Sequence, residues 1–206
     1  MGFYDRQVLP RLLDWGCGCD AVTQQRRKIV PLATGRVLEV GIGSGHNLPH
    51  YDPAKVSAVV GVDPAAPSLD IARRRAARSA VPLELLVSGG ESMPLPASSF
   101  DTVVVTYTLC SIPGLSTALA DMHRVLKPDG QLLFCEHGRA PDANVVRWQA
   151  RLGPLWGRCF GGCHLDRDIP AELSAGGFRV TRLEQAYLRG APRFAGYHYI
   201  GAARPQ

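Results

Sequence analysis

A glycine-rich turn at residues 41–45 is the first feature of the chain that could do chemistry. It follows a short apolar run at residues 36–40, which is typical of a buried strand, and it contains Gly41, Gly43 and Gly45. Glycine permits left-handed backbone conformations and lets the main chain approach a ligand closely. Ligands of open parallel sheets bind beyond the carboxyl ends of the strands. The turn therefore predicts a ligand site at the end of this strand.

Two carboxylates near the turn restrict what the site can bind. Glu39 precedes the turn, and Asp63 ends the next apolar run, at residues 57–62. A nicotinamide dinucleotide would require G-x-G-x-x-G, but His46 stands where the third glycine belongs, and no Gly-Lys-Ser/Thr of a phosphate loop follows. Asp63 could accept both hydroxyls of a ribose, and Glu39 would tolerate an ammonium or sulfonium group better than phosphates. The pattern predicts a nucleoside ligand without a pyrophosphate, and no binding of NAD.

With these residues in place, the chain resembles the class I S-adenosylmethionine-dependent methyltransferases from about residue 36 to its end. Four segments carry the resemblance: residues 38–45 (LEVGIGSG), 61–64 (GVDP), 91–101 (ESMPLPASSFD) and 124–130 (RVLKPDG). It implies an enzyme that uses S-adenosylmethionine and releases S-adenosylhomocysteine. Carried over residue by residue, it implies cofactor contacts at Glu39, Gly41, Gly43, Gly45, Asn47, Asp63, Pro64, Gly90, Glu91, Ser92 and Thr106.

The loop after the third expected strand departs from that family. Most members have Asp-Ala-Glu there, whereas this chain has Gly89, Gly90 and Glu91. The aspartate that would contact the adenine amino group is therefore missing. Backbone groups of residues 90–92 would have to hold the base, and Glu91 is open to a structural role instead.

The second half of the chain carries a narrower resemblance. Residues 108–112, 134–137, 148–156 and 162–168 are similar to the alkyl-thiol S-methyltransferases of animal microsomes and their soluble bacterial relatives. The animal enzymes carry an N-terminal membrane anchor, and this chain begins with polar-punctuated helical segments. The resemblance implies a small thiol as methyl acceptor, although soluble relatives need not share the substrates of the lipid-facing enzymes.

Other acceptors and other classes of function stay open at this point. The same cofactor residues would serve O-, N- or C-methylation of a quinone, a phospholipid headgroup or a natural product. Methylation of a metalloid held by Cys110 and others is a remote variant. A regulatory protein that binds the cofactor without catalysis is the alternative of a different class. The residue pattern decides neither among these nor on the oligomeric state.

Methyl transfer is an in-line displacement at an activated carbon, so the protein chiefly holds the nucleophile and the methyl group in position. A thiol needs little further help, because its pKa of about 8.5 leaves some thiolate at neutral pH. His137 directly follows the fifth expected strand and is the candidate catalytic residue, to stabilise or deprotonate the acceptor. The candidate substrate residues are Cys110, His164, Arg167 and Tyr197. His137 and Arg167 are equally open to structural roles.

Charge and cysteine usage exclude several other functions. The net charge of +5 includes basic clusters at residues 26–28 and 73–78, which are interpreted as solvated helix faces, and no motif predicts nucleic-acid binding. The six cysteines fit reduced thiols of a cytoplasmic protein better than a disulfide framework. We predict no metal site, because Cys17 and Cys19 lack the gap of two to four residues that is usual in zinc pairs, although Cys159, Cys163 and His164 have tolerable ligand spacing. No apolar run approaches the ~20 residues of a membrane span.

These residues must be positioned by alternating strands and helices. Strands are expected at 36–40, 57–62, 83–87, 100–106, 131–136, 178–187 and 194–203, and helices at 45–51, 67–79, 115–126, 143–158 and 168–176. The alternation predicts an α/β, Rossmann-like doubly wound sheet of about seven strands, mostly parallel, with an antiparallel C-terminal hairpin. Residues 1–206 should form a single methyltransferase domain, with 1–33 as a helical cap and 34–206 as the cofactor-binding core. Tyr4, Leu9, Leu12 and Trp15 of the cap are expected to cover the substrate side.

Overall fold

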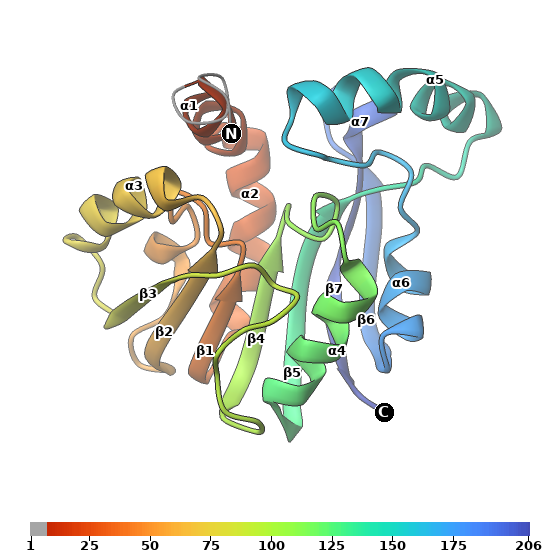
Figure 1. Ribbon diagram of the computed structural model, residues 1–206. Helices are drawn as coiled ribbons and strands as arrows, with labels where there is room; N and C mark the ends of the chain where they lie inside the picture. Colours follow the sequence, from red (N-terminus) through yellow and green to blue (C-terminus); the bar gives the residue numbers. More distant parts are fainter. Residues whose placement is uncertain (1–7) are drawn as a thin grey trace.

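The computed structural model describes residues 8–206, which form one seven-stranded sheet with the strand order β3-β2-β1-β4-β5-β7-β6. β7 runs antiparallel to both of its neighbours, β5 and β6, and the other pairings are parallel (Figure 1). The predicted fold class is therefore confirmed. The strands are β1 (Gly35–Val40), β2 (Val56–Asp63), β3 (Leu83–Val87), β4 (Phe100–Thr106), β5 (Leu126–His137), β6 (Phe178–Tyr187) and β7 (Tyr197–Pro205).

Helices lie on both faces of the sheet and across the carboxyl ends of its parallel strands. They are α1 (Leu9–Cys17), α2 (Asp20–Ile29), α3 (Ala66–Ala76), α4 (Leu115–Val125), α5 (Ala143–Cys159), α6 (Ile169–Ala175) and α7 (Arg193–Gly196), with short 3-10 turns at Val30–Leu32 and Leu48–His50. Across residues 8–206, no helix combines the length and the apolar character that crossing a bilayer requires.

Three boundaries differ from the sequence prediction. The helix expected at 45–51 is wrong: Gly45 adopts a left-handed φ of 79°, and only a short turn containing Pro49 follows. β5 begins at Leu126 rather than near 131, because Leu126 pairs with Phe100 of β4 across an irregularity in the register. The last strand begins at Tyr197, since α7 occupies the residues before it.

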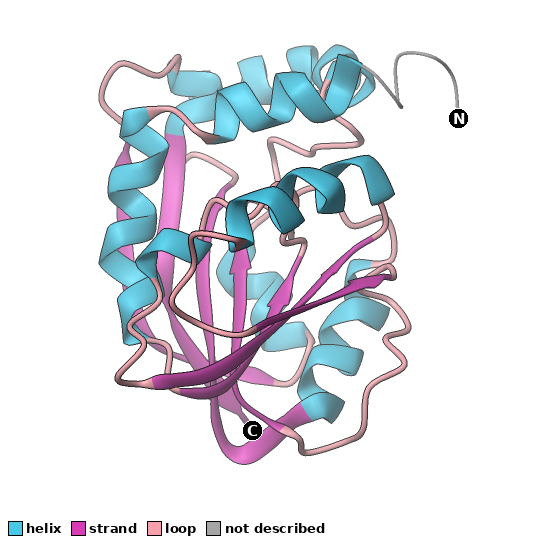
Figure 2. Ribbon diagram, turned by 90° about the vertical axis from the view of Figure 1, so that its left-hand side faces the viewer, coloured by secondary structure: helices cyan, strands magenta, loops and turns pink. Residues whose placement is uncertain are grey.

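Alternate residues of the central strands face opposite helical layers. One face packs against α2 and α3 through Val37, Val59, Val104 and Leu133. The other packs against α4 and α6 through Leu38, Val60, Val103 and Leu132. The view in Figure 2 shows helices on both sides of the twisted sheet. Burial on both faces explains why these strands are almost continuously apolar in sequence.

The strand order reverses between β1 and β4, which are neighbours in the sheet and parallel. From β1 the chain proceeds outward to β2 and β3, and it returns to β4 on the other side. In sheets of this kind, the connections that leave the two strands diverge and open a crevice at their carboxyl ends. In Figure 1, α1 and α5 lie beyond this end of the sheet.

One buried side chain fastens α5 to the rest of the molecule. Gln149 is 1% exposed, and its amide nitrogen donates to the carbonyl oxygens of Gly138, Leu165 and Phe194 at 2.9–3.0 Å. Its amide oxygen accepts from the backbone N–H of Ala140 at 3.0 Å. A single glutamine thus joins α5 to the end of β5, to the segment before α6 and to α7.

We predict that Gln149→Leu lowers the free energy of unfolding by roughly 2–4 kcal/mol, because it strands a buried N–H and buried carbonyls without partners. Urea unfolding followed by circular dichroism measures this loss. Gln24→Leu, at an exposed position of α2, is the matched control and should change stability by less than about 0.5 kcal/mol. Equal effects of the two substitutions would contradict the role of Gln149.

Candidate functional site

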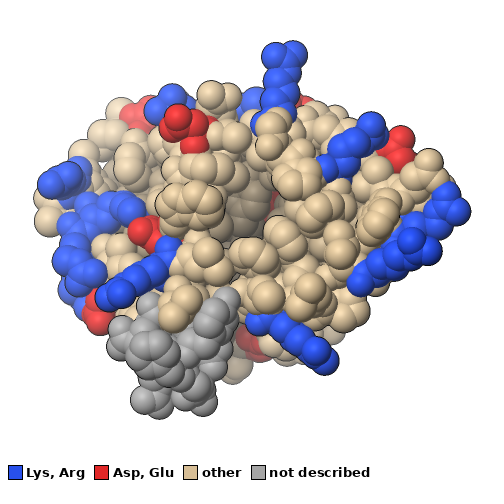
Figure 3. Space-filling view, turned by 90° about the horizontal axis from the view of Figure 1, so that it is seen from above, with Lys and Arg blue, Asp and Glu red and all other residues tan. Residues whose placement is uncertain are grey.

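The carboxyl ends of β1, β2, β4 and β5 meet at one end of the molecule, beneath α1 and α5. Figure 3 looks down on this end and shows a hollow near its centre among uncharged side chains, with lysines and arginines standing at the periphery. The glycine turn follows β1, and Asp63 ends β2, at this end of the sheet.

The glycine turn after β1 leaves one side of its backbone open. Gly41 and Gly43 have left-handed φ angles of 72° and 53°. A Cβ at Gly41 would lie 2.2 Å from the side chain of Thr108, so only glycine fits there. A Cβ at Gly43 would meet no atom closer than 4.0 Å. The backbone of Gly43 is therefore free to contact a ligand.

Asp63 is held at the end of β2 by the backbone. Its Oδ2 accepts from the N–H of Gly43 at 3.0 Å, and its Oδ1 accepts from the N–H of Ala65 at 2.8 Å, across Pro64. Burial raises the pKa of Asp63, and the hydrogen bonds from Ala65 and Gly43 oppose the shift. The carboxylate is thus oriented by one bond on each oxygen, and each oxygen keeps capacity for a second donor.

Glu39 lies deeper, and the protein itself satisfies both of its oxygens. Oε1 accepts from the Asn47 side-chain amide at 2.9 Å, and Oε2 accepts from the Tyr51 hydroxyl at 2.7 Å. Asn47 also donates to the hydroxyl of Thr106 at 3.0 Å. Glu39 is 2% exposed, and burial raises its pKa to about 7. No sequence motif pointed to Tyr51, and contact of Glu39 with a ligand stays a prediction.

Arg26 is a residue of the crevice that the sequence analysis misinterpreted. The expected solvated face holds for Arg27 and Lys28, which are exposed, but Arg26 is only 4% exposed. Its guanidinium lies over the ring of Tyr107, 4.9 Å from the centroid, and its Nε and Nη1 are buried without a hydrogen-bond partner. Its helical spacing with Ile29 and Val30, which are buried, was the signal that could have found it. A buried cation with unpartnered donors points to a missing anion.

α1 is fastened to the glycine turn through Asp14. The Asp14 carboxylate accepts from the Ser44 hydroxyl at 2.6 Å and lies 2.9 Å from Nε2 of His46 and 3.3 Å from Nη2 of Arg75. No local sequence pattern predicts this contact between residues far apart in the chain. The contacts of Asp14 hold the second half of the turn, at Ser44 and His46, against α1.

The cap expectation has a mixed outcome. A Cβ at Gly161 would lie 3.4 Å from Cδ2 of Leu9, so α1 approaches the loop after α5. Trp15 is 80% exposed, which contradicts the expectation that it covers the cleft. Tyr4 lies outside the described residues.

The loop after β3 is closely packed. A Cβ at Gly90 would lie 3.1 Å from Val40, so the chain passes tightly over the end of β1. Glu91 accepts from the N–H of Gly114 at 3.4 Å, which ties this loop to the start of α4 and fits a structural acid. Ser92 is exposed, and its carbonyl accepts from the Ser88 hydroxyl at 3.2 Å. Binding of a base by residues 90–92 stays a prediction.

Beyond β4 and β5, two cysteines and a histidine form a compact cluster. Sγ of Cys163 lies 3.7 Å from Sγ of Cys110 and 3.0 Å from Nε2 of His137. Cys110 is 2% exposed and Cys163 is 7% exposed, and Nδ1 of His137 is buried without a partner. The hydrogen bond from Cys163 lowers the pKa of Cys110 and raises that of Cys163 itself. Cys110 and His137 were predicted separately from the sequence, and Cys163 was not expected beside them.

The loop that carries Cys110 is clamped from two sides. Arg167 donates through its guanidinium to the carbonyl oxygens of Leu109 and Ile112. Glu136 accepts, through Oε1, from the N–H groups of Thr108 at 2.8 Å and Leu109 at 3.1 Å. Arg167 therefore positions the loop, and its contact with a substrate stays a prediction.

The side chains of the other two candidate substrate residues are not part of the cluster. The His164 side chain is exposed, while its backbone N–H donates to the carbonyl of Cys110 at 2.8 Å. Tyr197 packs edge-on between Tyr187 and Tyr199, with ring centroids 5.0 and 5.3 Å away. These contacts favour packing for Tyr197 and a backbone role for His164.

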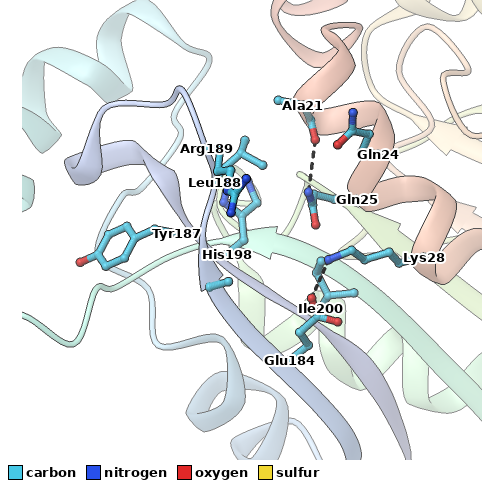
Figure 4. A pocket seen from close by; sticks show the side chains of 11 residues that line it. Ala21, Gln24, Gln25, Lys28, Glu184, Tyr187, Leu188, Arg189, His198 and Ile200 are labelled. Carbon is cyan, nitrogen blue, oxygen red and sulfur yellow. Dashed lines mark hydrogen bonds and ion pairs between the residues drawn. The ribbon is translucent and has the colours of Figure 1, made fainter.

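A separate pocket lies between α2 and the antiparallel strands (Figure 4). Gln24, Gln25 and Lys28 of α2 face β6 and β7 across it, and Nζ of Lys28 lies 2.5 Å from Oε1 of Glu184. His198, at its floor, bonds through Nδ1 to the carbonyl oxygen of Gly196 at 2.8 Å, and burial lowers its pKa to about 4. Within residues 8–206, the unpartnered buried side-chain atoms all lie outside this pocket, so we assign no chemistry to it.

Comparisons with known proteins agree with this architecture. A family described as a methyltransferase domain matches residues 38–134. The chain is 35% identical to thiol S-methyltransferase TMT1B of Rattus norvegicus over 72% of its own length and 62% of that protein's length. It is 32% identical to demethylmenaquinone methyltransferase of Thermus thermophilus, over 82% of its own length and 79% of that protein's. The crystal structure of a Thermotoga maritima SAM-dependent methyltransferase, described as a possible histamine N-methyltransferase, superposes with a TM-score of 0.71 at 20% identity, covering 98% of both chains.

The buried carboxyl of Glu39 predicts a pH dependence of stability. Its pKa rises on folding from 4.5 to about 7, so the fold favours the protonated form. That stabilisation is complete below pH 4.5 and is lost as the pH rises through 7. Glu39→Gln stays neutral, so its stability relative to the unaltered protein should improve by up to about 3 kcal/mol over this interval.

Urea unfolding of the ligand-free protein at a series of pH values checks this prediction. Glu84→Gln, at an exposed position of β3, is the control and should show a flat difference. A stability difference for Glu39→Gln that is the same at every pH would report only altered hydrogen bonds with Tyr51 and Asn47. That outcome would contradict the buried ionisation of Glu39.

Proposed function

The chain belongs to the family of S-adenosylmethionine-dependent methyltransferases, and from that premise we propose that it transfers a methyl group from S-adenosylmethionine to the sulfur of a small thiol. The observation that carries the choice of sulfur is the cluster of Cys110, His137 and Cys163, which lies beyond the carboxyl ends of β4 and β5. Soft sulfur and imidazole groups suit a sulfur nucleophile. The likeness to thiol S-methyltransferase TMT1B supports the same choice.

The cofactor would lie across the carboxyl ends of β1 and β2. Asp63 would accept the ribose hydroxyls, the open backbone of Gly43 would approach the nucleoside, and residues 90–92 would border the adenine. S-adenosylhomocysteine would leave from the same site after transfer. This placement directs the methyl group toward the ends of β4 and β5, where the cluster lies.

Arg26 would hold the carboxylate of the cofactor's methionine part. Two of its nitrogen atoms are buried and unpartnered, and its positive charge acts on the nearby Glu39, whose pKa it lowers against the effect of burial. An arriving carboxylate would satisfy the guanidinium, and the ammonium group of the same ligand would find Glu39 close by. The pair of opposite charges in the protein thus matches the pair of charges in the ligand.

Methyl transfer requires little from the protein beyond positioning the acceptor and the methyl group. Holding the thiol and the methyl group at near-attack distance can supply ~7–11 kcal/mol of the barrier. His137 was predicted to stabilise or deprotonate the acceptor. Its Nε2 is engaged with Cys163 at 3.0 Å, so His137 acts on an acceptor through the cluster, and a role as direct proton acceptor stays a prediction.

We predict that Arg26→Gln weakens binding of S-adenosylhomocysteine by about 10–100-fold, equivalent to about 1.4–2.8 kcal/mol for a lost charged contact. Binding of 5′-methylthioadenosine, which lacks the carboxylate, should not change. Isothermal titration calorimetry with both ligands measures the two affinities. Arg27→Gln, next in the chain but exposed, is the control and should bind both ligands normally. Equal weakening of both ligands by Arg26→Gln would indicate general damage and contradict the assignment.

A panel of acceptors with labelled S-adenosylmethionine tests the proposed function. Alkyl and aryl thiols should be methylated, at rates that rise with pH as the thiolate fraction grows toward the pKa of about 8.5. Asp63→Ala should slow transfer to every thiol alike, since it acts through the cofactor.

Transfer to phenols, amines or quinols with none to thiols would refute the sulfur assignment. A quinone acceptor is the second candidate, because demethylmenaquinone methyltransferase of Thermus thermophilus is similar over 79% of its length. Cofactor binding without transfer to any acceptor would support the non-catalytic alternative.

A further inference from the structure

We propose that Cys110, His137 and Cys163 bind one thiophilic divalent cation, of which zinc is the best match, and leave one coordination position for a further ligand. Each residue offers one ligand atom, and the three atoms lie within 4.8 Å of one another. Cys110 and Cys163 are buried. Two thiolates and one imidazole are a ligand set that zinc prefers.

The separations between the ligand atoms fit a tetrahedral ion. Two sulfurs each about 2.3 Å from a zinc ion are about 3.8 Å apart at the tetrahedral angle, and the observed Sγ–Sγ distance is 3.7 Å. A nitrogen at about 2.0 Å from the same ion would lie about 3.5 Å from each sulfur, and Nε2 of His137 lies 3.0 Å from Sγ of Cys163. Small movements of one imidazole therefore complete the geometry.

The three ligands are held by different elements before any ion arrives. Cys110 follows β4 in the loop that Arg167 and Glu136 clamp, and His137 ends β5. Cys163 follows α5, and the backbone bond from His164 to Cys110 keeps the two segments together at 2.8 Å. Preorganised ligands of this kind lose little entropy when an ion binds.

An additional donor supports the sulfur of Cys163. The indole Nε1–H of Trp156 points to Sγ of Cys163 at 3.3 Å. Hydrogen bonds from outside the coordination shell orient metal ligands and tune their charge. Trp156 is fixed in turn by stacking on Phe160, with ring centroids 4.1 Å apart.

The open position gives the ion a role in transfer, and this part of the inference rests on the proposed function. Zinc sites with three protein ligands keep a fourth position for water or substrate. The acceptor thiol would bind there through sulfur and release its proton to solvent, because a coordinated thiol is deprotonated. A sulfur lone pair then forms the new bond to the methyl carbon, while the old carbon–sulfur bond breaks and leaves its electron pair on S-adenosylhomocysteine. The neutral thioether leaves the ion.

Cobalt(II) titration of the reduced, metal-free full chain tests the site with a spectroscopic probe. We expect one Co²⁺ per chain, thiolate-to-cobalt charge-transfer bands in the near ultraviolet and tetrahedral d–d bands in the visible, with displacement by one equivalent of Zn²⁺. Cys110→Ser, Cys163→Ser and His137→Ala should each weaken Co²⁺ binding by more than about 100-fold, since loss of an outer-shell partner alone costs ~10–100-fold. Cys19→Ser and Cys159→Ser, at exposed positions, are the controls and should bind normally.

A second measurement on the unaltered chain removes dependence on the folding of variants. Cys110 and Cys163 are already buried, so the readout is the alkylation rate over a long incubation, mapped by mass spectrometry: relative to the metal-free chain, Zn²⁺ should slow alkylation of Cys110 and Cys163 and leave that of Cys19 unchanged. Absence of charge-transfer bands, or bands that persist in both Cys110→Ser and Cys163→Ser, would overturn the site. Neither assay contains cofactor or acceptor, so this failure would leave the acceptor panel to decide on thiol transfer.

A separate measurement tests the open coordination position of the ion. Addition of a small aryl thiol to the cobalt form should shift the d–d bands, and addition of the matching phenol should not. Cobalt bands that no thiol shifts would overturn the role in acceptor activation. If Zn²⁺-free protein methylates thiols as fast as the Zn²⁺ form, that result would overturn the same role while the proposed function stands.

Discussion

The reversal of strand order between β1 and β4 is the constraint on which the rest of this structure depends. The two strands are parallel neighbours, yet the chain leaves them in opposite directions along the sheet. No local connection fills the space between the carboxyl ends of β1 and β4, so side chains from distant segments must line this space. Asp14 of α1, Tyr51 of the segment before β2 and the loop after β4 all converge there.

Buried polar atoms without a partner gather near this end of the sheet, among the residues that the structure describes. Within residues 8–206, the buried side-chain nitrogen and oxygen atoms without a partner belong to Arg26, Asn47, Tyr107, Glu136 and His137. All five lie at or near the carboxyl ends of β1, β4 and β5. Buried polar groups are almost always paired in folded proteins, and this group of exceptions in one place supports the proposed ligand site.

Backbone strain and rigid clamps gather at the same place. Tyr107, directly after β4, has a φ of 56°, which non-glycine residues rarely adopt. The turn it makes brings the N–H groups of Thr108 and Leu109 onto Glu136, while Arg167 holds the loop from the other side. Gln149 holds α5 above it. A strained backbone of this kind persists only where several surrounding contacts hold it in place. Here the same contacts also fix the positions of Cys110 and Cys163.

By itself the sequence determined the sheet, the glycine turn and the acid that ends β2. These features are local: short apolar runs are typical of strands buried on both faces, Gly41 and Gly43 supply the left-handed backbone of the turn, and Asp63 ends its strand. Only the tertiary structure decided that Arg26 is buried while Arg27 is exposed, that Asp14 reaches the glycine turn, and that Cys163 joins Cys110 and His137. These outcomes depend on which faces of α1, α2 and the segment after α5 meet the sheet. Packing between residues far apart in the chain sets that choice, and no local pattern of residue types records it.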